Sequence, residues 1–220
     1  MRQGLQNLVI FDCDGVLVDS EIISVSVDQK VLADLGWSIS LEEITERFLG
    51  RSHAHFLEVV EDYLQRKLPD AWEDKYQHLY RDALNQDLQL VDGIVEALEA
   101  IELPTCVASN GSHSKMEFTL KRTELWSRFE GRIFSASDVA RGKPAPDLFL
   151  HAASALGFQP SQCVVVEDSP AGVEAALASN MKVIAYAGGL TPRSRFLGDG
   201  VTVIDHMNQL TEAITCATGN

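Results

Sequence analysis

The sequence predicts an α/β fold: a Rossmann-like parallel sheet core with helices on both faces and a helical cap inserted after the first strand. From about residue 104 onward, short apolar runs alternate with helical stretches, a pattern typical of a covered parallel sheet. Between about residues 20 and 90 the pattern is helical, and no strong strand interrupts it. We therefore expect a core formed by residues 1–19 and 90–220, and a cap domain formed by residues 20–89.

The first strand is predicted at residues 8–11, an apolar run that Asp12 and Asp14 follow directly. Gly15 allows the chain to turn there, so both carboxylates can face one site. Ligands of parallel sheets bind beyond the carboxyl ends of the strands. Two neighbouring anions are costly unless a cation joins them. This stretch therefore predicts a hard-metal site in which one carboxylate is free to attack an electrophile.

The cap is expected to be entirely helical. One helix is predicted after Ser20 and is ended by Gly36, which tolerates the left-handed conformation at a helix end. Ser40 and Ser52 are plausible N-caps for two later helices, because their hydroxyls can accept backbone N–H bonds. The later cap helices are expected near residues 41–48, 53–67 and 71–86.

Three further strands of the core are expected to end in polar groups. The predicted strand at 104–109 ends at Ser109 and Asn110, and the one at 163–166 is followed by Glu167 and Asp168. Lys143 lies in a loop beyond the short predicted strand at 132–135. Strands at 182–186 and 201–204 complete the expected sheet.

Each of these polar groups alone has an ordinary structural explanation. Ser109 and Asn110 suit a turn, Lys143 a solvated loop, and Glu167 and Asp168 the start of a helix. Chance rarely places acids, an amide and a lysine at neighbouring strand ends of one sheet. Together they suit phosphoryl transfer. Carboxylates hold Mg²⁺, one carboxylate attacks phosphorus, and the lysine and polar donors neutralise the phosphoryl oxygens.

Composition narrows the function classes. The net charge of −14 argues against a nucleic-acid partner and gives no reason to expect an acidic membrane surface. The four cysteines form no CxxC pair, which favours reduced core thiols over disulfides or zinc. The chain shows neither a membrane-length apolar run nor the apolar core of a signal peptide. We expect a cytoplasmic monomer whose partner is a small phosphorylated metabolite.

Four motifs, in order, resemble those of the haloacid dehalogenase superfamily, in its phosphatase and phosphomutase branch. They are Asp12-x-Asp14-Gly15-Val16-Leu17-Val18-Asp19-Ser20, Ser109-Asn110, Lys143-Pro144 and Glu167-Asp168-Ser169-x-x-Gly172. The resemblance implies a Mg²⁺-dependent hydrolase that works through an aspartyl-phosphate intermediate.

The resemblance also implies a role for each motif residue. Asp12 would be the nucleophile, and Asp14 the acid/base group that also lends a backbone carbonyl to Mg²⁺. Ser109, Lys143 and Asn110 would hold the transferring phosphoryl group. Metal binding is assigned to Asp12, Asp14, Glu167 and Asp168, and substrate binding to Asn110, Ser20 and the cap-loop residues Arg51, Ser52 and His53.

Two departures bear on the choice within the branch. His53 and Ser24 occupy positions where β-phosphoglucomutases carry arginine and histidine. These two differences count against the mutase interpretation. Asn180 replaces a frequent glycine but also suits a left-handed helix end. The leading hypothesis is a phosphatase of a small sugar phosphate, resembling 6-phosphogluconate. A β-phosphoglucomutase, a haloacid dehalogenase and an inactive binding protein on the same fold are the alternatives.

Overall fold

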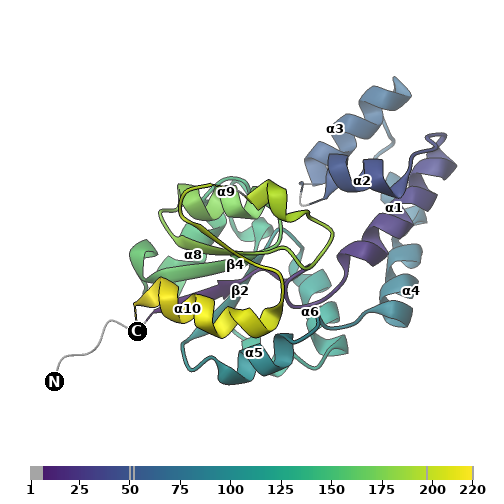
Figure 1. The fold of residues 1–220 in the computed structure, drawn as a ribbon. Helices are drawn as coiled ribbons and strands as arrows, with labels where there is room; N and C mark the ends of the chain where they lie inside the picture. The colour runs from purple at the N-terminus through teal and green to yellow at the C-terminus, as the bar shows by residue number, and fades with distance from the viewer. Residues whose placement is uncertain (1–6, 50, 52, 197, 220) are drawn as a thin grey trace.

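The computed structural model describes residues 7–49, 51, 53–196 and 198–219. Its centre is a six-stranded parallel sheet with strand order β3-β2-β1-β4-β5-β6 (Figure 1). The strands are β1 (Leu8–Phe11), β2 (Thr105–Ser109), β3 (Ile133–Ser135), β4 (Cys163–Glu167), β5 (Lys182–Tyr186) and β6 (Val201–Ile204). The predicted α/β fold is confirmed, and all six predicted strands are present.

Strand β1 lies in the middle of the sheet and is buried on both faces. Val9 pairs with Thr105 on one side and Val164 on the other. Successive side chains of β1 point to opposite faces, so Val9 and Phe11 join one core cluster and Leu8 and Ile10 the other. A run of four apolar residues is what a strand covered on both faces requires.

Each face of the sheet is covered by its own helices (Figure 1). Helices α5 (Ile94–Ala100), α6 (His113–Arg122), α7 (Trp126–Phe129) and α10 (Leu210–Thr218) supply side chains to one cluster. Helices α8 (Asp147–Ala155) and α9 (Pro170–Ala178) supply the other. Sequence analysis did not predict α5, α7 or α10. No helix in the described ranges is long and apolar enough to cross a membrane.

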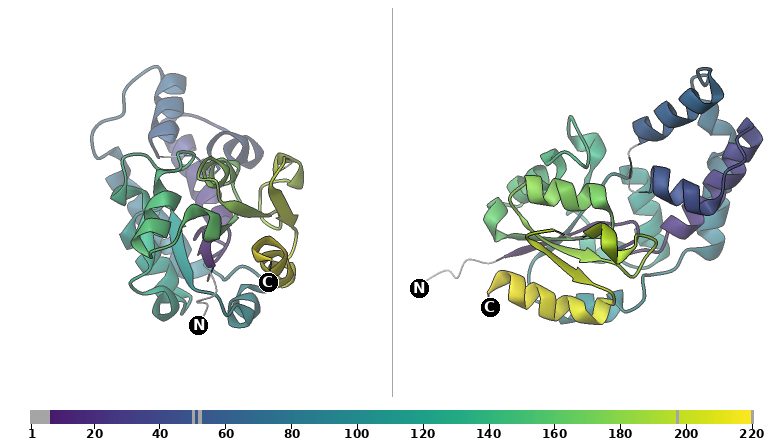
Figure 2. Two further views of the ribbon diagram at one scale, coloured as in Figure 1. Left: turned by 90° about the vertical axis from the view of Figure 1, so that its left-hand side faces the viewer. Right: turned by 45° about the horizontal axis from the view of Figure 1, so that its top comes forward.

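The helical insertion after β1 forms the cap, which lies to one side of the sheet (Figures 1 and 2). It comprises α1 (Glu21–Leu35), α2 (Leu41–Phe48), α3 (His53–Leu64), a short 3₁₀ turn η1 (Trp72–Lys75) and α4 (Gln77–Asp87). Its helices share apolar clusters of their own, centred on residues such as Leu32, Ile44 and Tyr76. The cap therefore has an interior of its own, although Ile23 of α1 and Leu84 of α4 join the core cluster on one face of the sheet.

Local signals in the cap are mostly as predicted. Gly36 ends α1 at φ +100°, and the Ser40 hydroxyl accepts the Glu43 N–H in a capping box. The helix predicted over 71–86 is instead interrupted between η1 and α4, and the one predicted over 53–67 ends at Leu64. Ser52, predicted as an N-cap, lies outside the described residues.

The chain leaves and re-enters the core along two neighbouring segments. Val18 forms an antiparallel bridge with Leu90, and the Asp19 N–H donates to the Gln89 carbonyl at 2.9 Å. Gly93 then starts α5 at φ +76°, a conformation that glycine adopts freely. The division at 19–20 and 89–90 remains a prediction, and these paired segments are where it would fall.

Candidate active site

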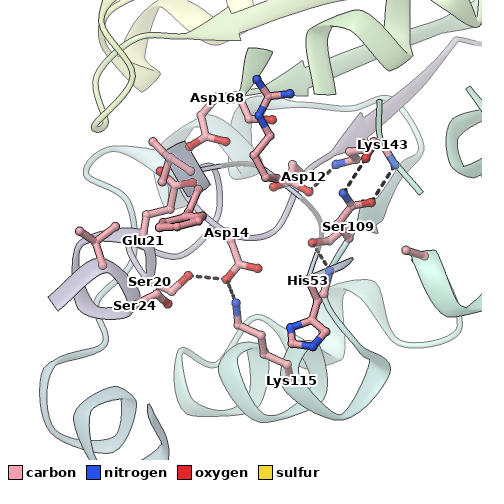
Figure 3. Close-up of a pocket in the computed structure, with 18 of the residues that line it drawn as sticks. Asp12, Asp14, Ser20, Glu21, Ser24, His53, Ser109, Lys115, Lys143 and Asp168 are labelled. Atoms are coloured by element: carbon pink, nitrogen blue, oxygen red, sulfur yellow. Dashed lines mark hydrogen bonds and ion pairs between the residues drawn. The ribbon is translucent and has the colours of Figure 1, made fainter. Parts of the chain in front are cut away.

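The ends of β1, β2 and β4 open into a cavity of about 470 Å³ that the cap also lines (Figure 3). Asp12, Ser109 and Glu167 reach it from the three strand ends, and Lys143 from the loop before α8. Arg51 and His53 reach it from the cap. The structure thus brings the predicted core residues together with the described part of the predicted cap loop.

Asp12 lies at the base of this cavity and is 7% exposed. Its backbone N–H donates to the Val166 carbonyl at 2.9 Å, which ties it to β4, and its Oδ1 accepts from Lys143 Nζ at 2.6 Å. Burial raises the pKa of Asp12 to about 7, although the Lys143 charge opposes this rise. Asp12 is therefore a buried carboxylate whose charge depends on nearby cations.

Lys143 connects two of the strand ends. Its ammonium group contacts Asp12 Oδ1 at 2.6 Å and Glu167 Oε1 at 2.5 Å, and its side chain is 3% exposed. Burial lowers the pKa of Lys143, but the two carboxylates outweigh burial and hold it above the usual value. The alternative of a solvated loop lysine is thus excluded, because Lys143 is buried between two acids.

The Asn110 side chain holds the Lys143 backbone. Its Oδ1 accepts from the Lys143 N–H at 2.9 Å, and its Nδ2 donates to the Lys143 carbonyl at 3.1 Å. The Ser109 hydroxyl accepts the Gly111 N–H at 3.1 Å. Asn110 therefore orients the lysine loop, a role that the sequence analysis did not predict.

Asp14 faces a different set of partners from Asp12. Its Oδ1 accepts from the Ser20 hydroxyl and lies 2.9 Å from Lys115 Nζ of α6 (Figure 3). Burial raises the pKa of Asp14, but Lys115 and the Ser20 hydroxyl outweigh burial, so the pKa lies below its usual value. The hydroxyl of Ser20, which is predicted to bind substrate, thus donates to Asp14 instead. Lys115 was not predicted as a site residue.

Glu167 is held by the start of helix α9. Its Oε2 accepts from the backbone N–H groups of Asp168 and Ser169 at 3.1 and 3.0 Å, and from the Ser169 hydroxyl at 2.9 Å. Gly172 leaves the room this side chain needs, because a Cβ there would lie 1.8 Å from Glu167 Cδ. The fourth motif thus builds a rigid socket for one carboxylate.

Three carboxylates can meet at one metal ion. Oxygens of Asp12, Glu167 and Asp168 lie within 4.8 Å of one another. Both Asp168 oxygens are buried, and neither has a hydrogen-bond partner among the residues that the structure describes. Burial, then the Glu21 charge, raises the Asp168 pKa well above its ordinary value. An oxygen-only donor set with orphaned buried carboxylate atoms fits a hard divalent cation. Asp14 is not part of this carboxylate group, which agrees with a residue that is predicted to lend the metal its backbone carbonyl.

Glu21 is a further acid at the site that the sequence analysis missed. It is the first residue of α1, it lines the cavity, and burial raises its pKa to about 8. Glu21 directly follows Ser20, the last residue of the first motif, and this position is the sequence feature that could have indicated its place in the site.

On the cap side, His53 Nε2 lies 2.7 Å from Glu73 Oε1, and the Arg51 side chain lines the cavity. A second cavity of about 350 Å³ extends into the cap and shares Arg51, His53, Asp28 and Lys115 with the first. The predicted substrate residue Ser52 lies outside the described residues. Arg51 and His53 of the cap loop therefore line both cavities.

Comparison with known proteins agrees with this geometry. A family model described as haloacid dehalogenase-like hydrolase matches residues 6–180. The 6-phosphogluconate phosphatase of Escherichia coli (strain K12) is 31% identical over 209 residues, which cover 93% of this chain and 92% of that one. A probable pseudouridine-5'-phosphatase of Drosophila melanogaster is 35% identical over 188 residues, 80% of this chain and 79% of that one.

A solved structure shows the same arrangement over nearly the whole chain. It is a haloacid dehalogenase-like protein of unknown function from Agrobacterium tumefaciens str. C58, 38% identical, with a TM-score of 0.82. The match covers 98% of this chain and 100% of that one. The chain described here therefore belongs to the haloacid dehalogenase-like hydrolases.

Proposed function

We propose that this protein is a Mg²⁺-dependent phosphatase that hydrolyses a small phosphorylated metabolite through an aspartyl-phosphate on Asp12. One observation carries the proposal. A buried carboxylate, that of Asp12, contacts a buried lysine and lies close to two further acids that could share a metal with it. Two of the relatives named above carry the descriptions 6-phosphogluconate phosphatase and probable pseudouridine-5'-phosphatase.

Asp12, Glu167 and Asp168 would hold the cation, which would neutralise phosphoryl oxygens and favour the ionised form of Asp12. The Asp12 carboxylate attacks phosphorus, and the bond to the leaving-group oxygen breaks. Lys143 stabilises the charge on the transferring phosphoryl group, and Asn110 keeps the lysine loop in place. The Ser109 hydroxyl, at the end of β2, is a further donor to that group.

Asp14 is assigned the proton transfers. Lys115 and Ser20 favour its ionised form, which can accept a proton from the water that hydrolyses the aspartyl-phosphate. The same carboxyl, once protonated, can donate to a leaving-group oxygen. Ser20 and Lys115 thereby act as positioning residues rather than as direct substrate ligands.

The leaving group would face the cap. Arg51, His53 and Asp28 offer a cation, an imidazole and a carboxylate around the two adjoining cavities. Such a mixed polar lining suits a hydroxyl-rich leaving group, so we propose a sugar phosphate, with 6-phosphogluconate as the first candidate. Monomeric state, a cytoplasmic location and the absence of nucleic-acid or membrane partners remain predictions.

A phosphate-release screen over several dozen phosphorylated metabolites tests this proposal. We expect Mg²⁺-dependent release from p-nitrophenyl phosphate and from at least one sugar phosphate, and loss of both with EDTA. No release from any substrate would contradict the proposal and favour an inactive binding protein. Full phosphate release after chelation would contradict the Mg²⁺ dependence, and glucose 6-phosphate formation from β-glucose 1-phosphate would favour the mutase.

A further inference from the structure

Glu21 begins the first helix of the cap, yet its side chain meets the acids of the core (Figure 3). Gly15 shows how closely the groups approach. A Cβ on Gly15 would lie 1.9 Å from Asp168 Oδ2 and 3.0 Å from Glu21 Cδ. The two carboxyl groups thus share the space over this glycine, which adopts φ +76°.

Within the described part of the chain, three oxygens of this pair have no hydrogen-bond partner. They are Glu21 Oε2, Asp168 Oδ1 and Asp168 Oδ2, all buried. Asp168 is 2% exposed, so water does not replace the missing partners at its surface. Buried carboxylates without donors are expensive, and two of them in contact are more so.

The lysines of the site already have other carboxylate partners. Lys143 contacts Asp12 and Glu167, and Lys115 contacts Asp14. Among the described residues, neither Glu21 nor Asp168 forms an ion pair within 4.0 Å. The pair therefore lacks a cationic partner, and Asp168 is itself one of the three acids that could hold a metal.

We propose that Glu21 is a fourth carboxylate of the metal centre and helps Asp12, Glu167 and Asp168 to hold the divalent cation. The inference rests on the proposed function, since it requires that the site takes a metal. It also links the cap to the core, because Glu21 belongs to α1 and the other three acids to the ends of β1 and β4. Metal binding would then stabilise the base of the cap as well as the catalytic centre.

The test is a Mg²⁺ titration of Glu21→Gln without substrate. Isothermal calorimetry measures the affinity, and the rise in melting temperature with Mg²⁺ provides a second readout. Mutation of a group that supports the direct ligands of a metal typically lowers metal affinity about 10- to 100-fold. We therefore expect Glu21→Gln to bind Mg²⁺ at least about 10-fold more weakly than the wild type. Asp34→Asn removes the same charge from an exposed position at the far end of α1 and is expected to bind Mg²⁺ like the wild type. If the glutamine variant does not fold, Glu21→Ala still tests the proposal, because wild-type Mg²⁺ affinity in that variant would overturn it.

The competing explanation is a protonated Glu21 that donates a hydrogen bond to Asp168 and has no part in metal binding. Glutamine keeps that donor, so the explanation predicts unchanged Mg²⁺ affinity in Glu21→Gln, and this result would overturn the proposal. A wild-type protein that does not bind Mg²⁺ would instead contradict the metal dependence of the proposed function. The two failures are therefore distinguishable.

Discussion

Lys143→Met removes the cation that joins two strand ends while keeping most of the side-chain volume. Lys143 contacts Asp12 and Glu167 at 2.6 and 2.5 Å and is 3% exposed. Removing one partner from a buried ion pair costs about 3–5 kcal/mol, because the remaining charge is uncompensated. Asp12 can limit this cost by taking up a proton, since its pKa is already about 7. We therefore expect the lower end of the range, about 3 kcal/mol at neutral pH without metal.

Urea unfolding followed by circular dichroism measures this loss. A loss of about 3 kcal/mol corresponds to a midpoint lower by roughly 1 M or more, for a slope of about 1–3 kcal/mol/M. The difference from the wild type should shrink at pH 5.5, where Asp12 is protonated, and with saturating Mg²⁺, which restores positive charge. Phosphate release should fall by at least about 100-fold.

Lys121→Met is the matched control, because Lys121 is an exposed lysine that pairs with Glu117 four residues away and lies over the Trp126 ring. Its removal should change stability by no more than about 0.5 kcal/mol. If Lys143→Met also costs less than about 1 kcal/mol, the two carboxylates do not depend on Lys143. The electrostatic reasoning for the site would then be refuted.

Three further predictions concern the socket, the cap and pH. Gly172→Ala should displace the Glu167 carboxylate and lower the free energy of unfolding in urea by about 1–3 kcal/mol. It should also weaken Mg²⁺ binding in a calorimetric titration, and wild-type Mg²⁺ affinity would contradict the assigned role of Gly172. Arg51→Ala and His53→Ala should raise KM for the natural substrate about tenfold and leave p-nitrophenyl phosphate unaffected, whereas equal effects on both substrates would remove the loop as the specificity element. Burial raises the pKa of Asp28 from 3.8 to about 6, so ionisation of Asp28 makes the wild type less stable as pH rises between these values. Asparagine does not ionise, so the melting temperature of Asp28→Asn minus that of the wild type should increase from pH 4 to pH 7. A difference that does not change with pH would contradict the assigned pKa.

The acids at the strand ends could be predicted because sequence order and sheet geometry coincide there. Asp12 and Glu167 follow buried apolar runs, and carboxyl ends of parallel strands share one edge of the sheet. The helix expected near 53–67 and the one near 71–86 were less accurate. The latter is interrupted at Tyr76, which packs into the cap interior and follows a 3₁₀ turn. Such tertiary packing leaves little trace in local periodicity.

The missed residues share one cause. Glu21 and Lys115 each lie in the first turn of a helix, and sequence spacing does not say toward which neighbour such a side chain is directed. Both meet acids from other elements, Asp168 and Asp14, so their roles depend on the packing of α1 and α6 against the core. Asn110 differs, because its position was predicted but its hold on the Lys143 backbone was not.

The central claim is that Asp12 is the nucleophile, and Asp12→Asn tests it most directly. The variant keeps the shape of a residue that is 7% exposed, so its melting temperature should stay close to that of the wild type. With Mg²⁺ and p-nitrophenyl phosphate, we expect phosphate release to fall by several orders of magnitude, as loss of a covalent nucleophile does. A folded Asp12→Asn enzyme with more than roughly a few percent of wild-type turnover would contradict the aspartyl-phosphate mechanism.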